Sequence, residues 1–589
     1  MFKKRVTALA LSLAMTTPLL VACGNDPASN NVNESSEVSI SSEESSVVSS
    51  EEKEFDPRSI TEGVTLTIAV ESDAEIIDYE TNKSTLIIEE KFGVDLVFEV
   101  YTAADFTDKL NVMINGGDKL PDIIFGQGTA TGLNSMTAAW AASGAFLELS
   151  DFYANPDYAK YINMAIEHEG FNFVDTMRDA DGNVWGLPKY YPSTHDSTGI
   201  RGWINTEYAK ACGFEEMPKT TEEFFELCKA FAAAGDLNGN GIDDEAVFSG
   251  YKKIDQYWFK YLMSPFAYAW DDKFMDVKDG VLEFSYTTDG WKEGLKYIKQ
   301  FFDEGLIDTT ILTQDSAAYK AVAYDPSMPV LCEFYYMPRM VGKDDLETQL
   351  CQLAYTYVPA LEGPSGVAEA YYKDQIAYNG GMITVDCENP EAAFIIMDYL
   401  CSQEMSIRNR WGEEGENWDF WENVDESKLP DGMTVEQMKA ANSDKATFLD
   451  YGNASYWAQG NPQNDGYMLE GPSIHFNDFQ GRIMGDPEGE NELQAAQSRW
   501  NIMQPKMWED MLAFKPDETI VTLPSTSEET EAIAELDAVI SSYWKLAAAN
   551  FITGAWDIDK DWSTYLSELE EMGVKDLLAL YQTAFDRTK

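Results

Sequence analysis

Histidine and cysteine are scarce in this sequence. Its 589 residues include only three histidines, His168, His195 and His475, and no HExxH motif. Catalysis by a Ser-His-Asp triad or by a histidine-bound metal therefore has little material to draw on. There are seven cysteines and no CxxC pair, which argues against a thiolate zinc site. So few cysteines in so long a chain do not make a disulfide scaffold, and spacing leaves their pairing open.

Basic residues are also outnumbered. Lysine and arginine total 42 against 102 aspartates and glutamates, giving a formal charge of −60. Such a surface repels nucleic acid phosphates and anionic lipid headgroups, so we expect no nucleic acid partner. The charge suits a neutral or cationic small ligand without identifying one, and it equally fits a surface that is acidic for solubility. The length exceeds what one core needs, which predicts two or more lobes.

The N-terminus carries a processing signal. Three basic residues, Lys3 to Arg5, precede an apolar run that polar residues interrupt and that is short for a membrane span. The run ends in Leu20-Val21-Ala22-Cys23, which resembles the bacterial lipobox. An ordinary secretory signal is the alternative. The resemblance implies that residues 1–22 are removed and that Cys23 is lipidated. The protein would then be extracytoplasmic, lipid-anchored to the outer face of the cell membrane.

The segment after Cys23 is predicted to be a linker. Residues 30–54 are almost entirely Ser, Glu, Asn and Val, with no aromatic residue before Phe55. Such a segment cannot bury enough apolar area to offset its chain entropy, and its acidic residues repel one another. Residues 23–60 are therefore expected to hold a folded body away from the membrane.

Folded sequence is expected from about residue 61. Strand patterns at 64–70, 94–101 and 120–126 alternate with helix patterns at 83–92 and 106–114. This order is typical of an open α/β sheet, in which ligands bind beyond the carboxyl ends of the strands. Asp73 follows the first strand and Gln127 follows the third, so both are predicted to lie at the ligand-binding edge.

Further helices are predicted downstream. Thr220 and Glu223 fit a capping box at the start of a helix that Gly235 ends. Asn389 is expected to cap another helix, with Pro390 in its first turn. Periodic apolar residues predict three more helices, at residues 288–304, 531–547 and 561–585. The weak periodicity of residues 405–480 predicts loops there.

An oxygen-rich loop follows Gly235. Asp236, Asn238 and Asn240 occupy positions 1, 3 and 5 of an EF-hand-like pattern, and Gly241 at position 6 allows the Ile242 carbonyl to turn inward. Asp244 takes position 9. Position 12 is Val247, so the usual bidentate glutamate is missing. The loop at 236–245 predicts a structural calcium ion, and a metal-free Asx-rich turn is the alternative.

Several segments together resemble extracellular solute-binding proteins of family 1. They are Leu120–Ile124, Gly182–Pro188, Arg201–Asn205, Asn389–Ala393, Arg410–Gly415, Phe551–Gly554 and Met572–Val574. Each is weak alone, but their number and order resemble the long, lipobox-bearing branch found beside ABC permeases for complex sugars. In alginate-binding members of the family, the acid pair that matches Asp244 and Glu245 closes the calcium site.

The resemblance implies a fold and a division of the chain. The expected fold is α/β, two-lobed and periplasmic-binding-protein-like (type II), with discontinuous lobes, a hinge and an interlobe cleft. The N-lobe would comprise residues 61–195 and 374–450. The C-lobe would comprise residues 196–373 and 451–589.

The resemblance also implies a function. The chain would be a monomeric substrate-binding lipoprotein that binds an oligosaccharide and passes it to the permease subunits of an ABC importer, without catalysing a reaction. The alternatives are a secreted calcium-containing glycoside hydrolase or lyase, and a surface glycan adhesin without a transporter. Adjacent carboxylates at Glu413 and Glu414 do not establish the opposed pair that a glycosidase needs.

Aromatic residues supply candidates for the sugar site. There are 15 tryptophans, and an indole face is a good partner for the apolar face of a sugar, while polar side chains bind its hydroxyls. Trp140, Trp291, Trp500 and Trp544 fall in helical patterns and are interpreted as packing residues. The predicted ligand-binding set is Asp73, Gln127, Arg201, Trp203, Trp258, Trp270, Trp411, Glu413 and Trp418, with Tyr335, Tyr336 and Arg339 as weaker candidates.

Overall fold

The computed structural model divides the chain into two units, residues 1–54 and Phe55–Lys589. The predictions for the signal segment, for Cys23, for most of the linker, for Gln127 and for Arg339 lie outside the described residues. Those residues are 55–126, 133–242, 244–248, 250, 256–323, 328–338, 346–430, 433–442, 446–451, 462–466, 468, 470–476, 480–483 and 492–589.

A six-stranded sheet forms the centre of the first lobe. Its strand order is β14-β4-β11-β3-β1-β2. The parallel strands β1 (Thr65–Glu71), β2 (Asp95–Tyr101) and β3 (Ile123–Phe125) alternate with helices α2 (Lys83–Phe92) and α3 (Phe106–Gly116). This confirms the predicted strand–helix alternation. The sheet is completed by β4 (Leu187–Tyr190), β11 (Tyr378–Ile383) and β14 (Ser473–Ile474).

Helix α14 (Pro390–Leu400) packs on this sheet and is buried over most of its length. Pro390 occupies its first turn as predicted, but the Asn389 side chain makes no capping hydrogen bond. Asp398 instead caps a neighbour: its carboxylate accepts the backbone N–H groups of Tyr161 and Ile162 at the start of α6 (Lys160–Glu169). The helix therefore contributes both an apolar core face and one buried polar contact.

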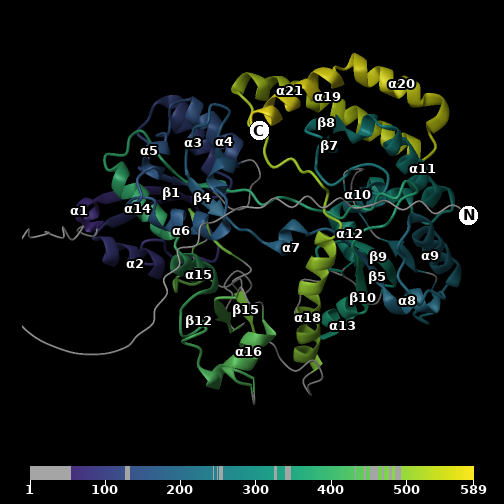
Figure 1. Cartoon of the computed structure of the whole chain (residues 1–589), viewed down its shortest axis with the longest axis horizontal. Helices are drawn as coiled ribbons and strands as arrows, with labels where there is room; N and C mark the ends of the chain where they lie inside the picture. Colours follow the sequence, from purple (N-terminus) through teal and green to yellow (C-terminus); the bar gives the residue numbers. More distant parts are fainter. Residues whose placement is uncertain are drawn as a thin grey trace, which may run out of the picture. The chain divides into compact units, whose positions relative to one another are not determined.

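A four-stranded sheet forms the centre of the second lobe, with the order β10-β5-β9-β6. Strand β5 (Arg201–Asn205) lies between β9 (Val330–Tyr335) and β10 (Tyr355–Val358), so all five of its residues are buried. The predicted capping box at Thr220 and Glu223 is confirmed at the start of α9 (Thr221–Ala234). The remaining strand is β6 (Ala246–Phe248). Figure 1 shows β1 and β4 among purple and blue helices, and β5, β9 and β10 among teal ones.

The C-terminal helices complete the core of the second lobe. Helix α19 (Ser527–Ile552) packs on α11 (Asp289–Asp303), and α21 (Val574–Asp586) packs on the hairpin of β7 (Met275–Lys278) and β8 (Val281–Phe284) (Figure 1). The predicted single helix at 561–585 is wrong. It is two helices, α20 (Ile558–Glu571) and α21, because Gly573 takes a left-handed φ of +93° that a continuous helix does not allow.

Residues 405–480 are not the loops that their weak periodicity predicted. They include most of α15 (Gln403–Trp411), all of α16 (Val435–Ala441) and two strands of a small sheet, β12 (Trp418–Phe420) and β13 (Phe448–Asp450). A third strand, β15 (Gln480–Arg482), completes this sheet. Because β14 pairs with β4, residues 473–474 belong to the sheet of the first lobe, which moves them across the predicted boundary at 450.

The remaining helices connect these layers. One of them, α1, begins within the predicted linker. They are α1 (Arg58–Thr61), α4 (Leu133–Ala142), α5 (Ser150–Tyr153), α7 (Thr194–Ser197), α8 (Thr206–Ala211), α10 (Tyr257–Met263), α12 (Ser316–Ala323), α13 (Leu346–Leu353) and α18 (Glu492–Leu512).

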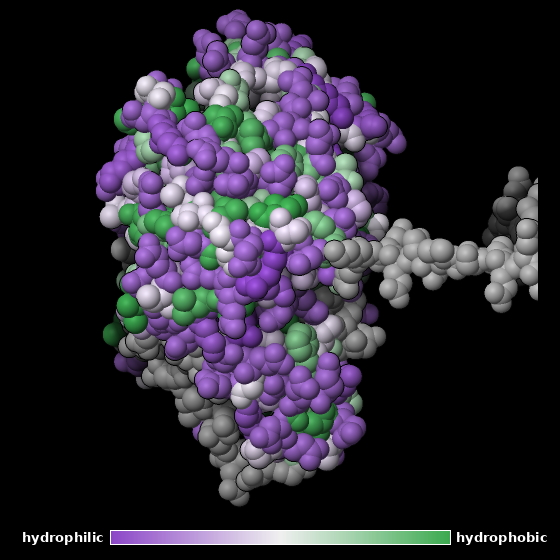
Figure 2. Space-filling view, turned by 90° about the vertical axis from the view of Figure 1, so that its left-hand side faces the viewer, coloured by the Kyte–Doolittle hydropathy of each residue, from purple (hydrophilic) through white to green (hydrophobic). Residues whose placement is uncertain are grey.

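The face of the molecule in Figure 2 is largely hydrophilic, with hydrophobic residues gathered in separate patches between hydrophilic ones. Among the described helices, none combines the length and the apolar character that crossing a membrane requires.

Candidate functional site

The two lobes are joined where the chain passes from β4 to β5 through α7. Tyr191 follows β4, and its hydroxyl lies 2.6 Å from the Ser473 hydroxyl. The returning chain meets this segment at Ser197: the Lys373 N–H donates to the Ser197 carbonyl, and the Gln375 amide lies 3.0 Å from the Ser197 hydroxyl. Hydrogen bonds therefore hold the outgoing and returning segments together.

A series of half-buried aromatic rings lies at this crossing. The ring centroids of Tyr257 and Tyr335 are 5.3 Å apart, and those of Tyr335 and Tyr336 are 5.5 Å apart. The ring centroid of His195 is 5.5 Å from that of Tyr336 and 6.1 Å from that of Trp508. Each of these side chains keeps part of its surface in solvent. Apolar ring surface and polar ring atoms thus occur side by side, as a sugar site requires.

Trp508 is the tryptophan of this series, and sequence reasoning missed it. It lies in α18, and its indole N–H finds no hydrogen-bond partner among the described residues. The Nδ1 atom of His195 also has no hydrogen-bond partner among the described residues. Position in the sequence gave no signal, because Trp508 reaches the crossing only through the packing of α18.

The structure corrects the roles predicted for five tryptophans. Trp203 is fully buried, stacks on Trp500 at 5.6 Å, and donates its indole N–H to the Tyr335 carbonyl. The reason is that Trp203 lies in a central strand, which neighbours cover. The five rings predicted as ligand platforms are all at most 3% exposed and belong to hydrophobic cores: Trp203, Trp258, Trp270, Trp411 and Trp418.

Arg201 is also used internally. Its guanidinium donates to the carbonyls of Tyr336, at 2.7 Å, and His195, at 3.2 Å. Burial is the main cause that lowers its pKa, to about 10. The prediction that Arg201 binds sugar hydroxyls is therefore not supported by its contacts. Arg201 instead fixes the end of β9 against α7, and so positions two rings of the aromatic series.

Glu413 is committed to ion pairs. Its carboxylate lies 2.7 Å from Arg408 and 2.5 Å from Lys83. Burial acts to raise its pKa, but the hydrogen bonds from Lys83 and Arg408 outweigh burial and lower it. The neighbouring Glu414 is half-buried and contacts Asn423. These contacts tie Glu413 into a structural network and do not present it to a ligand.

Asp73 lies directly after β1, at the strand end where ligands were expected. Its carboxylate accepts the Glu75 N–H at 2.7 Å. Glu470 lies close by, and burial, followed by the negative charge of Asp73, raises the Glu470 pKa to about 7. Lys189 acts in the opposite direction. Sequence reasoning missed Glu470 because nearly 400 residues of sequence separate it from Asp73.

The oxygen-rich loop is closed by hydrogen bonds from backbone N–H groups to its acidic side chains. The Asp236 carboxylate accepts the N–H groups of Asn240, at 3.0 Å, and Gly241, at 2.8 Å. Gly241 has a φ of +83°, which favours glycine. At the other end, the Glu245 carboxylate accepts the N–H groups of Leu237 and Asp244. The loop therefore closes on itself and carries its acidic side chains on one turn.

The donor set of this loop fits a hard cation only if amide and carbonyl oxygens take part. The described residues contain no group of three or more His, Cys, Asp or Glu side chains able to hold a metal ion. Calcium accepts asparagine and backbone oxygens alongside carboxylates. Asn238, Asn240 and the Ile242 carbonyl would supply them, together with Asp236 and Asp244.

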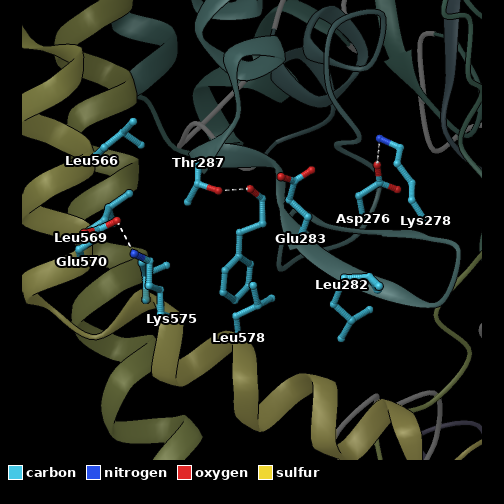
Figure 3. Close-up of a pocket in the computed structure, with 13 residues that line it drawn as sticks. Asp276, Lys278, Leu282, Glu283, Thr287, Leu566, Leu569, Glu570, Lys575 and Leu578 are labelled. Carbon is cyan, nitrogen blue, oxygen red and sulfur yellow. Dashed lines mark hydrogen bonds and ion pairs between the residues drawn. The ribbon is translucent and has the colours of Figure 1, made fainter.

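A cavity of about 490 Å³ lies elsewhere, between the β7–β8 hairpin and helices α20 and α21 (Figure 3). Its lining is mainly apolar, with the ion pairs Asp276–Lys278 and Glu570–Lys575 among its charged residues. The lining includes none of the described residues that were predicted for the ligand site. This cavity therefore does not coincide with the aromatic series at the crossing.

Comparison with known proteins relates the chain to an ABC transporter substrate-binding protein and to a lipoprotein. No family model matches it. The fructooligosaccharide ABC transporter substrate-binding protein FusA of Streptococcus pneumoniae serotype 4 is 27% identical over 521 residues, which is 85% of this chain and 86% of FusA. Lipoprotein LipO of Bacillus subtilis is 23% identical over 527 residues, which is 86% of this chain and 90% of LipO.

Solved structures share the fold. FusA in complex with kestose has a TM-score of 0.63 at 23% identity, covering 89% of this chain and 99% of FusA. A solute-binding protein of Bifidobacterium longum subsp. infantis has a TM-score of 0.68 at 17% identity, covering 89% and 98%. Alginate-binding AlgQ2 without calcium has a TM-score of 0.56 at 17% identity, covering 89% and 98%. The resemblance to solute-binding proteins and the two-lobed α/β fold are confirmed.

Proposed function

We propose that this protein is the substrate-binding component of an ABC importer and that it binds an oligosaccharide at the crossing between its lobes. The observation that carries the proposal is the half-buried aromatic series from Tyr257 to Trp508, found in a chain that is 27% identical to the ABC transporter substrate-binding protein FusA. The permease subunits would be its protein partners, and a monomer would suffice for binding.

Sugar chemistry explains why such a site suits the proposal. A sugar ring has an apolar C–H face that packs on an aromatic ring, and hydroxyls that need fixed hydrogen-bonding groups. The Trp508 indole N–H and the His195 Nδ1 atom lie beside this ring surface; both atoms are buried and have no hydrogen-bond partner among the described residues. The relative FusA is a substrate-binding protein, and Glu413 is held in ion pairs, so no covalent step is proposed.

Calorimetric titration with purified fructooligosaccharides and other oligosaccharides tests this function. We expect a cognate sugar to bind, to change the tryptophan fluorescence and to be recovered intact. Recovery of shortened sugar would place the protein among glycoside hydrolases. Binding without any functional link to a permease would favour an adhesin. No binding by any sugar at millimolar concentration would overturn the carbohydrate proposal.

We further propose a structural calcium ion in the loop 236–245, held by Asp236, Asn238, Asn240, Ile242, Asp244 and Glu245. The oxygen donors of the loop support this, and one solved relative is described as an EF-hand mutant of FusA. Calcium that binds only the folded state stabilises it by mass action. Chelation should lower the melting temperature and leave sugar preference unchanged. Metal analysis that finds no calcium, with no thermal response to added calcium, would remove the site.

A further inference from the structure

The sugar site does not account for the cavity between the β7–β8 hairpin and helices α20 and α21. This cavity measures about 490 Å³, which lies within the range of small-molecule sites, roughly 300–1,000 Å³. The helices form one wall, where Leu569 is buried and where Leu566 and Leu578 keep part of their surface in solvent. The hairpin forms the opposite wall (Figure 3). Apolar surface left in contact with water favours a ligand with an apolar body.

The hairpin brings apolar and charged side chains to the same cavity. Along β8 the burial alternates, with Leu282 and Phe284 buried and Val281 and Glu283 exposed. All four residues line the cavity. Successive side chains of a strand point to opposite faces, which explains the alternation. Glu283 is therefore a charged group that the cavity presents to solvent.

Two of the three carboxylates that line the cavity are held in ion pairs. Asp276 lies 2.6 Å from the Lys278 ammonium, and Glu570 lies 2.6 Å from the Lys575 ammonium. The third carboxylate, that of Glu283, has no hydrogen-bond or ion-pair partner in the part of the chain that the structure describes, and Figure 3 joins it to no neighbour. The lining therefore holds one carboxylate more than it has ammonium groups.

The strand register adds to this excess of negative charge. Glu283 lies directly opposite Asp276, and like charges at opposite positions of an antiparallel pair repel each other. The hydrogen bond to Asp276 is the main cause that raises the pKa of Lys278, and the charges of Glu283 and Glu369 act in the same direction. One ammonium thus serves three carboxylates. Burial, followed by the charge of Asp276, raises the pKa of Glu369 to about 7.

Two further lysines near the hairpin have other partners. The Lys589 ammonium donates to the Gly280 carbonyl at the hairpin turn, at 3.0 Å, and lies 2.6 Å from Asp586. The Lys273 ammonium lies 5.7 Å from the centre of the Tyr581 ring. Within the described residues, neither lysine forms an ion pair with Glu283. The position of a counter-ion for this carboxylate is therefore open to a ligand.

We propose that this cavity is a second ligand site, which binds a small organic cation that combines an apolar body with an ammonium group. The leucines of α20 and α21 cover the apolar body, and Glu283 accepts hydrogen bonds from the ammonium, which are stronger than those between neutral groups. The net charge of −60 attracts cations to the whole molecule. This site is separate from the sugar site at the lobe crossing and does not rest on the proposed sugar binding.

Three compounds with the same apolar body test the proposal on the whole protein. Phenylbutylamine, phenylbutanol and phenylbutanoate are positive, neutral and negative at pH 7. Ligand-observed NMR titration suits the millimolar affinity that ligands of this size support. We expect the amine to bind roughly fivefold more tightly than the alcohol, the upper range for an exposed ion pair, and the carboxylate to bind most weakly. High salt should reduce the preference for the amine.

Variants locate the contact. Glu283→Gln should remove the preference for the amine and leave the affinity for the alcohol unchanged. Glu304→Gln is the matched control, because Glu304 at the end of α11 is also exposed and its carboxylate has no hydrogen-bond or ion-pair partner among the described residues. Leu578→Trp should fill the cavity and weaken both the amine and the alcohol. If thermal unfolding shows that this variant is not folded, Val281→Trp, at an exposed position of the lining, takes its place.

Each alternative outcome contradicts a stated part of the proposal. Equal affinity for amine and alcohol, or a preference that survives Glu283→Gln, overturns the cationic ligand. Loss of the preference in Glu304→Gln does so as well, because net charge would then produce it. Absence of amine binding at millimolar concentration, or binding that the tryptophan variant leaves unchanged, overturns the site. A dimer that the tryptophan variant dissociates would assign the cavity to contact between two copies of the chain. Sugar affinity, measured in parallel, should be the same in every variant.

Discussion

Trp508 and Trp203 show how two indoles in one chain take different roles. Trp508 is half-buried at the aromatic series, whereas Trp203 lies under its neighbours in a central strand. Trp508→Ala should therefore weaken binding of a cognate oligosaccharide by about 2 kcal/mol, roughly thirtyfold, with little loss of stability. Calorimetric titration measures the affinity, and thermal unfolding measures the stability.

Trp203→Ala is the control for this prediction. Removing a fully buried indole should lower the free energy of unfolding by about 3–5 kcal/mol, while the folded fraction keeps its affinity. Both quantities come from the same two measurements. Equal affinity of wild type and Trp508→Ala would remove Trp508 from the site.

Asp398 gives a pH dependence to stability. Burial, its largest influence, raises its pKa from an ordinary value of 3.8 to about 7, against the two backbone N–H groups that it accepts. Between pH 4 and pH 7 the unfolded state thus binds fewer protons than the folded state, so this group costs stability as pH rises. The free energy of unfolding of Asp398→Asn, taken relative to that of wild type, should therefore increase by on the order of 2–4 kcal/mol when the pH is raised from 4.5 to 8.

Urea unfolding at the two pH values measures this difference, in which the titration of other groups cancels. The exposed Asp151 supplies the control, because Asp151→Asn should leave the difference near zero. A constant offset between wild type and Asp398→Asn at both pH values would contradict the prediction.

At the scale of elements, the start of α19 is tied to the end of α21. Thr526 and Glu529 form a capping box, and the Glu529 carboxylate also receives both terminal nitrogens of Arg587, at 2.7 and 2.5 Å. The hydrogen bond from Arg587 is the main cause that lowers the Glu529 pKa from 4.5 to about 2. The folded-state pKa is lower than the unfolded one, so the contribution is present above pH 4.5 and is lost as pH falls towards 2.

Glu529→Gln should therefore lower the free energy of unfolding by about 1–2 kcal/mol at pH 7, since glutamine keeps the capping geometry but loses the charge-assisted bonds. The loss should shrink towards zero near pH 2.5. Chemical unfolding at both pH values checks this. Glu528→Gln, at the exposed neighbouring position, should change little, and an equal cost for both variants would rule out the Arg587 contact as the cause.

At the scale of the whole molecule, the expected anchor decides where the sugar site works. The relative LipO is a lipoprotein, and Cys23 follows a small residue after an apolar run. We predict that Cys23→Ser releases the protein or leaves it unprocessed. Fractionation and mass spectrometry measure this outcome. An unmodified Cys23 in the membrane fraction of wild-type cells would contradict lipidation, and the affinity of the folded body for sugar should be the same in either form.

The sequence by itself determined the local features of this protein. Helix α9 begins at its capping box and ends at Gly235 because both signals lie within a few residues of the helix. The alternation of β1, α2, β2, α3 and β3 follows from apolar periodicity in the same way. The oxygen-rich loop was readable for the same reason, because its donors are neighbours in sequence. The order of several weak motifs indicated the two-lobed fold.

Only the tertiary structure decided which side chains meet. A tryptophan looks the same in the sequence whether it lies in a core or in a binding site. The five tryptophans predicted as ligand platforms are buried, and the strands and helices that cover them are distant in the sequence. Trp508 and Arg410 reach the lobe crossing, and Glu470 reaches Asp73, across hundreds of residues of sequence. Charge behaves likewise: composition gives the net −60, but local potential depends on the few nearest groups, since salt screens the rest.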